Sequence, residues 1–269
     1  MLGAEKLERG LIKLQGEDSF KFLQGLVTND VKLASKGIYC FLLTANGRYL
    51  FDFFLIELEF YYIIDVALTQ KDELLAKLTL YKMRSKLSIS DVSDEYIVTY
   101  SRSIITNDAI FSYQDPRYTK LGFRSLMLNS NPQYYEEHNL YLQDKYNYSI
   151  IDGSVDMIKD KSIPIEYGAE HLNAISYSKG CYVGQEVISR TKYQGVIRKS
   201  IMKIELDRPC VGLSGQDIFQ GSNKLGSICS SFENKAIALI RNENYNANQE
   251  EPLIVDNAII TRISKACWY

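Results

Sequence analysis

One short stretch of the sequence combines the residue types that thiol chemistry requires. Residues 179–186, here called the octet, read Lys-Gly-Cys-Tyr-Val-Gly-Gln-Glu, so Cys181 lies between two glycines and close to Lys179. Glycine adopts positive φ angles and lets a ligand or a second backbone come close. A neighbouring cation favours thiolate, the form of cysteine that acts as nucleophile and metal ligand. We therefore predict that Cys181 is a reactive, accessible thiol and that Lys179 supports its ionisation.

The other cysteines lack such a setting. A free cysteine is most often a small, buried, apolar residue, and we predict this structural role for the remaining four. The five cysteines form no Cys-x-x-Cys pair, and their number is odd. This pattern argues against a disulfide framework and against a metal or cluster bound permanently by this chain alone. The cysteines predicted to be structural are Cys40, Cys210, Cys229 and Cys267.

The octet resembles the signature of the YgfZ-type folate-binding proteins, Lys-Gly-Cys-Tyr/Phe-x-Gly-Gln-Glu, at every fixed position. That family is related to the glycine-cleavage T-protein, an aminomethyltransferase, and serves iron–sulfur cluster assembly. Further stretches of the chain are similar to the same superfamily. They are residues 9–12, 16–18, 22–31, 43–48, 81–87, 115–124 and 163–166.

The resemblance implies a ligand, partners and a set of binding residues. The ligand would be tetrahydrofolate or a related folate, and the partners would be iron–sulfur apoproteins or cluster-assembly proteins. A pterin ring presents a row of donors and acceptors that a carboxylate can pair with, and a basic side chain can contact the anionic glutamyl tail. The predicted folate-binding residues are Asn29, Asp30, Asp52, Glu166, Gln185, Glu186 and Arg190.

One departure from the T-protein separates two functions. In the T-protein a pair of aspartates follows the glycine of the first hairpin, whereas this chain has Phe51-Asp52. Phenylalanine cannot take or give a proton, so acid–base chemistry at that position is lost. This favours an accessory factor in iron–sulfur cluster assembly or repair. A folate-dependent one-carbon, aminomethyl-type transferase with an unknown acceptor stays open as the alternative, as does an adaptor that folate only stabilises, and whether the protein is an enzyme is undecided.

Composition sets further limits. The chain has 269 residues, a net charge of −2 and 46% hydrophobic residues, enough for two or three units with a sizeable core. The charge gives no electrostatic reason for a nucleic-acid partner. We find no basic and apolar leader and no apolar run of membrane-spanning length, so we expect no membrane partner. The absence of paired cysteines is typical of a reducing compartment, and we expect a cytoplasmic monomer.

The elements that must hold these residues alternate between strand and helix in the N-terminal part. Asn46-Gly47 between two apolar runs, 39–43 and 49–58, predicts a β-hairpin. Asp18 is the expected N-cap of a helix that buries Phe20, Leu23 and Val27, and further helices are predicted over 73–83 and 134–146. Further strands are expected at 11–14, 60–66, 87–89, 96–100, 109–113 and 123–128. The predicted strands and helices do not alternate as βαβ units, which favours an α+β fold.

The sequence changes character after Arg198. Short apolar runs, among them one at Val211, are separated by Gly, Asn, Asp and Ser, which predicts a small antiparallel β-barrel. We therefore divide the chain into a folate-binding, T-protein-like region of two subdomains, 1–195, and a C-terminal barrel, 196–269. The passage between them is expected at 195–199, directly after the octet.

Overall fold

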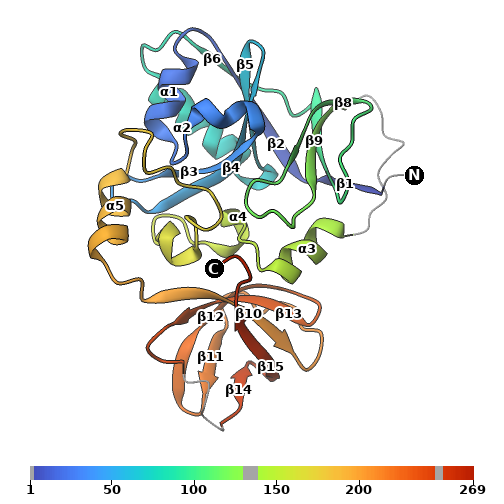
Figure 1. The fold of residues 1–269 in the computed structure, drawn as a ribbon, viewed down its shortest axis with the longest axis vertical. Coiled ribbons are helices and arrows are strands. Elements are labelled where there is room, and N and C mark those ends of the chain that lie inside the picture. Colours follow the sequence, from blue (N-terminus) through green and yellow to red (C-terminus); the bar gives the residue numbers. More distant parts are fainter. Residues whose placement is uncertain (1–2, 130–138, 246–250) are drawn as a thin grey trace.

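A body of sheets and helices and a smaller barrel make up the computed structural model, with the barrel at one end of the long axis (Figure 1). The structure describes residues 3–129, 139–245 and 251–269. Two antiparallel sheets lie in the body, and six antiparallel strands close the barrel. The predicted α+β class and the C-terminal antiparallel barrel are therefore confirmed.

The first sheet is buried on both faces. Alternate residues of its first strand join two different apolar clusters, with Tyr39 and Phe41 on one face and Cys40 and Leu42 on the other. This alternation follows from the period of two in a β-strand. The hairpin predicted at Asn46-Gly47 is present, with Gly47 at φ +67°. In spatial order the strands are β3 (Ile38–Leu43), β4 (Tyr49–Leu58), β5 (Tyr61–Ala67), β2 (Arg9–Gln15) and β6 (Ser88–Asp91).

Helices cover the sheets and lead to the barrel (Figure 1). The helices predicted after Asp18 and over 73–83 are observed, whereas the helices over 153–156 and 185–194 were not predicted. The helix expected over 134–146 starts outside the described residues, and the described part of that region is helical up to Tyr148. Among the described residues, no helix has both the length and the apolar character needed to cross a membrane. The α-helices are α1 (Ser19–Leu26), α2 (Lys71–Lys82), α3 (Leu140–Tyr148), α4 (Gly153–Asp156) and α5 (Gln185–Gln194).

Three local predictions need correction. Phe20 is 38% exposed, because only the face of α1 that carries Leu23 packs on the sheet. Asp18 lies at the N-cap position, but its carboxylate accepts a hydrogen bond from the Lys86 N–H at 2.7 Å and not from α1. Val211 is 99% exposed and lies in a loop, not in a strand.

The second sheet borders a buried layer of charged side chains. Arg117 and Arg124 are 0% and 1% exposed. Arg117 donates to Asp115 at 2.6 Å and to Asp152 at 2.7 Å, and Arg124 donates to Asp65 at 2.8 Å. Buried charges are tolerated when such pairs satisfy them. In spatial order the strands of this sheet are β1 (Ala4–Leu7), β7 (Tyr96–Ser101), β9 (Phe123–Leu128) and β8 (Ala109–Gln114).

The barrel is buried on its inside and also where it meets the body. In the second strand of its ring, Ala238 and Ile240 join the barrel interior, whereas Ile237 and Leu239 join the apolar cluster of the body. The two parts of the chain therefore share a continuous core. Around the ring the strands are β10 (Lys199–Leu206), β13 (Lys235–Arg241), β12 (Asn223–Phe232), β11 (Asp217–Gln220), β14 (Leu253–Val255) and β15 (Ala258–Lys265).

The segment after β15 returns from the barrel to the body. The ring of Trp268 packs against Gly168, which lies at φ +74° and leaves no room for a Cβ. Trp268 Nε1 donates to the Ser149 carbonyl oxygen at 3.2 Å. Only 8% of Trp268 is exposed, so this segment closes part of the core of the body.

Candidate functional site

The octet forms an exposed loop that runs into α5. Cys181 is exposed, whereas the neighbouring Tyr182 is buried and anchors the loop. Both glycines have positive φ angles, +94° at Gly180 and +84° at Gly184. Gly184 packs directly on the β3–β4 hairpin turn, where an added Cβ would lie 2.6 Å from the Thr44 carbonyl oxygen. The second glycine of the octet is therefore a packing residue, and the first is left open to solvent.

The chain before and within the octet is bonded to residues 24–29, which we call the platform segment. This segment comprises the end of α1 and the residues that follow it. Side chains and backbone groups of both segments form these hydrogen bonds. Two stretches that resemble the YgfZ-type proteins are therefore in direct contact. The contacts are Thr28 Oγ1 to Ala174 O at 2.6 Å, Asn29 Nδ2 to Asn173 O at 2.8 Å, Ser176 N to Thr28 O at 3.0 Å, Gln24 Nε2 to Lys179 O at 3.3 Å, Val183 N to Gly25 O at 3.2 Å and Lys179 Nζ to Val27 O.

Lys179 is directed into the protein. Its ammonium group donates to the Val27 carbonyl oxygen at the end of α1 and lies 5.1 Å from the centre of the Tyr182 ring. Burial lowers the pKa of Lys179 to about 8, against the opposing effects of Cys40 and Asp30. A cation at the C-terminus of a helix is electrostatically favourable. The role of Lys179 supported by this geometry is to hold the loop.

The five thiols differ in access. Cys40 and Cys229 are buried, and burial raises the pKa of both thiols. Cys210 is half-buried, whereas Cys267 is exposed like Cys181 and contacts the Tyr148 carbonyl oxygen at 3.6 Å. The structural role predicted for the other four therefore suits the two buried cysteines and does not explain the exposure of Cys267.

Three of the predicted folate-binding residues lie in the body and already have partners there. Asp52 is 5% exposed and accepts hydrogen bonds from the hydroxyl groups of Tyr39 and Tyr49, both at 2.9 Å. Asn29 belongs to the platform segment. Asp30 accepts from Gln24 at 2.9 Å and from the Lys32 N–H at 3.1 Å. These polar groups stabilise the local structure around the octet and the hairpin.

The remaining four predicted residues lie near α5. Glu166 sits in a 3₁₀ helix (Pro164–Tyr167) and its carboxylate lies 3.5 Å from Lys199 Nζ at the start of the barrel. Gln185 is half-buried at the start of α5, and Glu186 and Arg190 are exposed on that helix. The structure thus distributes the predicted folate set over the platform, the core and α5.

A cavity of about 420 Å³ opens in the body, and the sequence prediction missed it. The accessible surface of its walls is largely apolar, and the charged residues that line it are Glu5, Lys6, Glu8, Arg9, Arg124 and Asp152. Arg124 Nε is buried and has no hydrogen-bond partner among the described residues. Arg9 and Arg124 fall within two stretches that resemble the T-protein superfamily, and this resemblance was the only sequence signal that pointed to these two residues of the cavity. The apolar part of the wall comprises Leu7, Ala67, Leu68, Leu142 and Val155.

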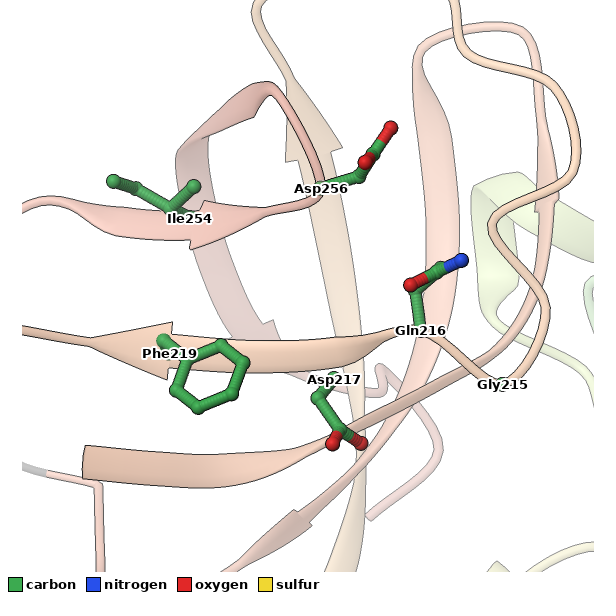
Figure 2. A pocket seen from close by; sticks show the side chains of 6 residues that line it. All are labelled: Gly215, Gln216, Asp217, Phe219, Ile254 and Asp256. Carbon is green, nitrogen blue, oxygen red and sulfur yellow. The ribbon is translucent and has the colours of Figure 1, made fainter. Parts of the chain in front are cut away.

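The barrel carries a second hollow, of about 340 Å³, between β11 and β14 (Figure 2). Phe219 and Ile254 lie side by side on these two strands, and the carboxylates of Asp217 and Asp256 point away from each other (Figure 2). Asp217 is already paired with Lys224 at 2.6 Å. These side chains do not converge on a common point, so the hollow has less of the character of a binding site than the cavity in the body.

Replacing Gly184 with Ala tests the packing of the octet. We expect Gly184→Ala to lower the free energy of unfolding by about 3 kcal/mol, because the new Cβ adds a contact with the Thr44 carbonyl oxygen to the cost of a positive φ. Gly180→Ala is the matched control, since it has a similar φ and open space, and it should cost about 1–2 kcal/mol. Urea denaturation measures both values. Equal costs would contradict the packing role of Gly184.

The barrel matches a known protein family. The family described as "CAF17, C-terminal beta-barrel domain" matches residues 198–268. This range starts one residue before β10 and ends at Trp268, within the segment that returns to the body. The match therefore covers the closed six-stranded barrel and its C-terminal extension.

The chain is similar in sequence to curated proteins named iron–sulfur cluster assembly factor IBA57. It is 30% identical to the homologue from Dictyostelium discoideum over 246 residues, with 73% of this chain and 60% of that protein covered. It is 30% identical to the homologue from Pyricularia oryzae, with 76% of this chain and 55% of that protein covered. It is 27% identical to the Homo sapiens protein, with 87% and 76% covered. The chain thus spans little more than half the length of the first two relatives.

These relatives change two of the predictions. The similarity to iron–sulfur cluster assembly factors is confirmed, but the similar proteins found are named IBA57, not YgfZ. The predicted cytoplasmic location is wrong on this comparison, because the relatives are named mitochondrial proteins. The cysteines could not have identified the compartment, since unpaired cysteines indicate a reducing environment and do not distinguish one such compartment from another.

Among solved structures, the chain resembles the glycine cleavage system aminomethyltransferase T from Bartonella henselae. The TM-score is 0.73 at 12% sequence identity, and the alignment covers 98% of this chain and 84% of that one. At this identity the likeness concerns the fold. The chain therefore has an aminomethyltransferase-like fold that ends in a barrel of the CAF17 C-terminal kind, and its sequence is similar to iron–sulfur cluster assembly factors.

Proposed function

We propose that this protein is an accessory factor in iron–sulfur cluster assembly or repair that acts through Cys181. The observation that carries the proposal is the exposed thiol on a loop that the platform segment holds on both sides. The names of the similar proteins support the same process. Iron–sulfur enzyme activity in cells that contain only a Cys181→Ala variant is the direct test.

The chemistry of a cluster determines what Cys181 can contribute. Iron–sulfur clusters are usually held by four cysteine thiolates. Cys181 can supply one of them from the surface of this chain, whereas Cys40 and Cys229 are buried. The remaining ligands would come from a partner, either an iron–sulfur apoprotein or a cluster-assembly protein. In this proposal the cluster is cargo that two proteins handle together.

We further propose that the cavity in the body binds tetrahydrofolate or a related folate. Ligand sites are commonly cavities of about 300–1,000 Å³ with apolar walls and a few polar groups, and the cavity of about 420 Å³ has this character. Arg9 lines the cavity with a side chain that is 14% exposed, and its guanidinium can donate to a carbonyl oxygen of a pterin. Glu8 also lines the cavity, and a carboxylate there can accept from pterin N–H groups.

Thermal unfolding with and without folate tests this site. At a reduced-folate concentration about 100-fold above Kd, the melting temperature should rise by about 5 °C or more, because the ligand binds the folded state. Val155→Trp should abolish the shift by filling the cavity, since Val155 lines it and is 55% exposed. Ile158→Trp is the matched control, as Ile158 is 60% exposed and does not line the cavity. An equal shift in both variants would place the folate elsewhere.

A folate-dependent one-carbon transferase is the second candidate. The aminomethyltransferase-like fold favours it, and the position of Phe51 argues against it. Phe51 is fully buried in an apolar cluster, so no proton donor or acceptor occupies that position beside Asp52. Turnover of methylene- or formyl-tetrahydrofolate by the purified protein would support the transferase.

A further inference from the structure

The side-chain amide of Gln24 joins the end of α1 to the stretch that carries Cys181. Its Nε2 donates to the Lys179 carbonyl oxygen at 3.3 Å and to Asp30 Oδ1 at 2.9 Å. Its Oε1 accepts a hydrogen bond from the Val31 N–H at 2.9 Å. An amide whose donor and acceptor are both engaged fixes the two segments relative to each other.

The residues at the thiol have little packing of their own. Gly180 lies at φ +94°, and an added Cβ there would meet no atom within 4 Å. Cys181 is exposed. The backbone at these two residues therefore depends on its flanks. On one side the Lys179 carbonyl oxygen accepts a hydrogen bond from Gln24. On the other side the Val183 N–H donates to the Gly25 carbonyl oxygen in α1.

We propose that Gln24 is a positioning residue for Cys181 and acts through its hydrogen bond to the Lys179 carbonyl oxygen. The inference rests on the proposed role of Cys181 as the functional thiol. Without this bond, the peptide between Lys179 and Gly180 can rotate over the wide range of angles that glycine permits. The thiol then samples many directions, whereas the intact loop presents it to a docked partner in one direction.

Gln24→Met tests the proposal with little change in side-chain volume. Methionine keeps the length of glutamine, carries no charge and removes all three hydrogen bonds. Lys21→Met is the matched control, because Lys21 lies on the exposed face of the same helix. Two measurements on the full chain are needed, hydrogen exchange of peptides spanning 176–184 and iodoacetamide labelling of Cys181 relative to Cys267, the second exposed thiol.

In Gln24→Met, amide exchange over 176–184 should rise about fivefold, the effect of losing one typical hydrogen bond. The Cys181-to-Cys267 labelling ratio should move towards one over the whole pH range tested, because a freed loop presents an ordinary exposed thiol. The melting temperature should stay close to that of the wild type, and Lys21→Met should change neither measurement.

Wild-type exchange and an unchanged labelling ratio in Gln24→Met would overturn the proposal. A large fall in melting temperature with faster exchange throughout the first sheet would also refute it, since Gln24 would then be a general structural residue. Both outcomes can be distinguished from failure of the proposed function. If cells with Cys181→Ala keep full iron–sulfur enzyme activity, the function of the thiol is wrong, but the exchange result is unaffected.

Discussion

Cells that contain only the Cys181→Ala variant should lose most of the iron–sulfur enzyme activity that depends on this protein. Removing groups that merely orient a metal ligand commonly costs 10- to 100-fold, so removing the ligand itself should cost at least about tenfold. The purified variant should unfold at the wild-type temperature, because Cys181 is exposed and supports no core contact. Enzyme assays in cell extracts, paired with thermal unfolding of the purified protein, measure the two effects separately.

Cys267→Ala provides the control for Cys181→Ala. Cys267 is the other exposed thiol, and it lies next to Trp268 and contacts the Tyr148 carbonyl oxygen. The Cys267→Ala variant should leave iron–sulfur enzyme activity unchanged. Full activity in Cys181→Ala would contradict the proposed function, and equal losses in both variants would mean that the position of the thiol in the octet has no special role.

Arg117→Met should produce the largest loss of stability. Arg117 is fully buried and its guanidinium donates to Asp115 at 2.6 and 2.9 Å and to Asp152 at 2.7 Å. Breaking a buried ion pair leaves an uncompensated carboxylate and typically costs about 3–5 kcal/mol. Chemical denaturation of the purified variant measures this loss in the free energy of unfolding.

The pH dependence of stability should change in the same variant. Burial raises the pKa of Asp152, but Lys145 and Arg117 outweigh it and hold that pKa well below the usual range. A lowered carboxyl pKa stabilises the fold above the pKa of the unfolded chain, about 3.9, and this stabilisation is lost as the pH falls. Arg117→Met should therefore flatten the decline in stability below about pH 4.

Arg102→Met is the control for burial. Arg102 also pairs with a carboxylate, Asp144 at 2.9 Å, but its own side chain is 54% exposed. Asp144 is only 8% exposed, but it keeps the Tyr100 hydroxyl as a donor at 2.9 Å when Arg102 is removed, so the loss should be about 1–2 kcal/mol. Similar losses in Arg102→Met and Arg117→Met would contradict the importance of the buried charge layer.

Local signals were sufficient to predict much of the fold. The Asn46-Gly47 turn and the flanking apolar runs predicted the β3–β4 hairpin because turn type and strand register are set within a few residues. The barrel was predicted from short apolar runs between turn residues. Val211 was misassigned because a two-residue apolar run looks alike in a strand and in a loop, and only cross-strand partners separate the two.

The site was harder to predict because long-range contacts decide it. The exposed position of Cys181 agrees with the prediction, although no local pattern indicates that Lys179 turns inwards to the end of α1. Asp52 looked like a ligand carboxylate, but two tyrosines from the same hairpin satisfy it. Arg124 drew attention only as part of a stretch that resembles the superfamily, and only tertiary structure buries it beside the cavity. Polar residue types in a motif thus do not reveal whether their partner is a ligand or the protein itself.

The docking of Trp268 on Gly168 has a consequence for biosynthesis. A ribosome adds about 5–20 residues per second, so Gly168 is made on the order of ten seconds before Trp268. Throughout that interval the nascent body lacks the aromatic ring that covers this part of its core. Chaperones therefore have a defined apolar surface to protect until Trp268 has been made, and a stop codon late in the barrel would release a chain whose defect lies in the body.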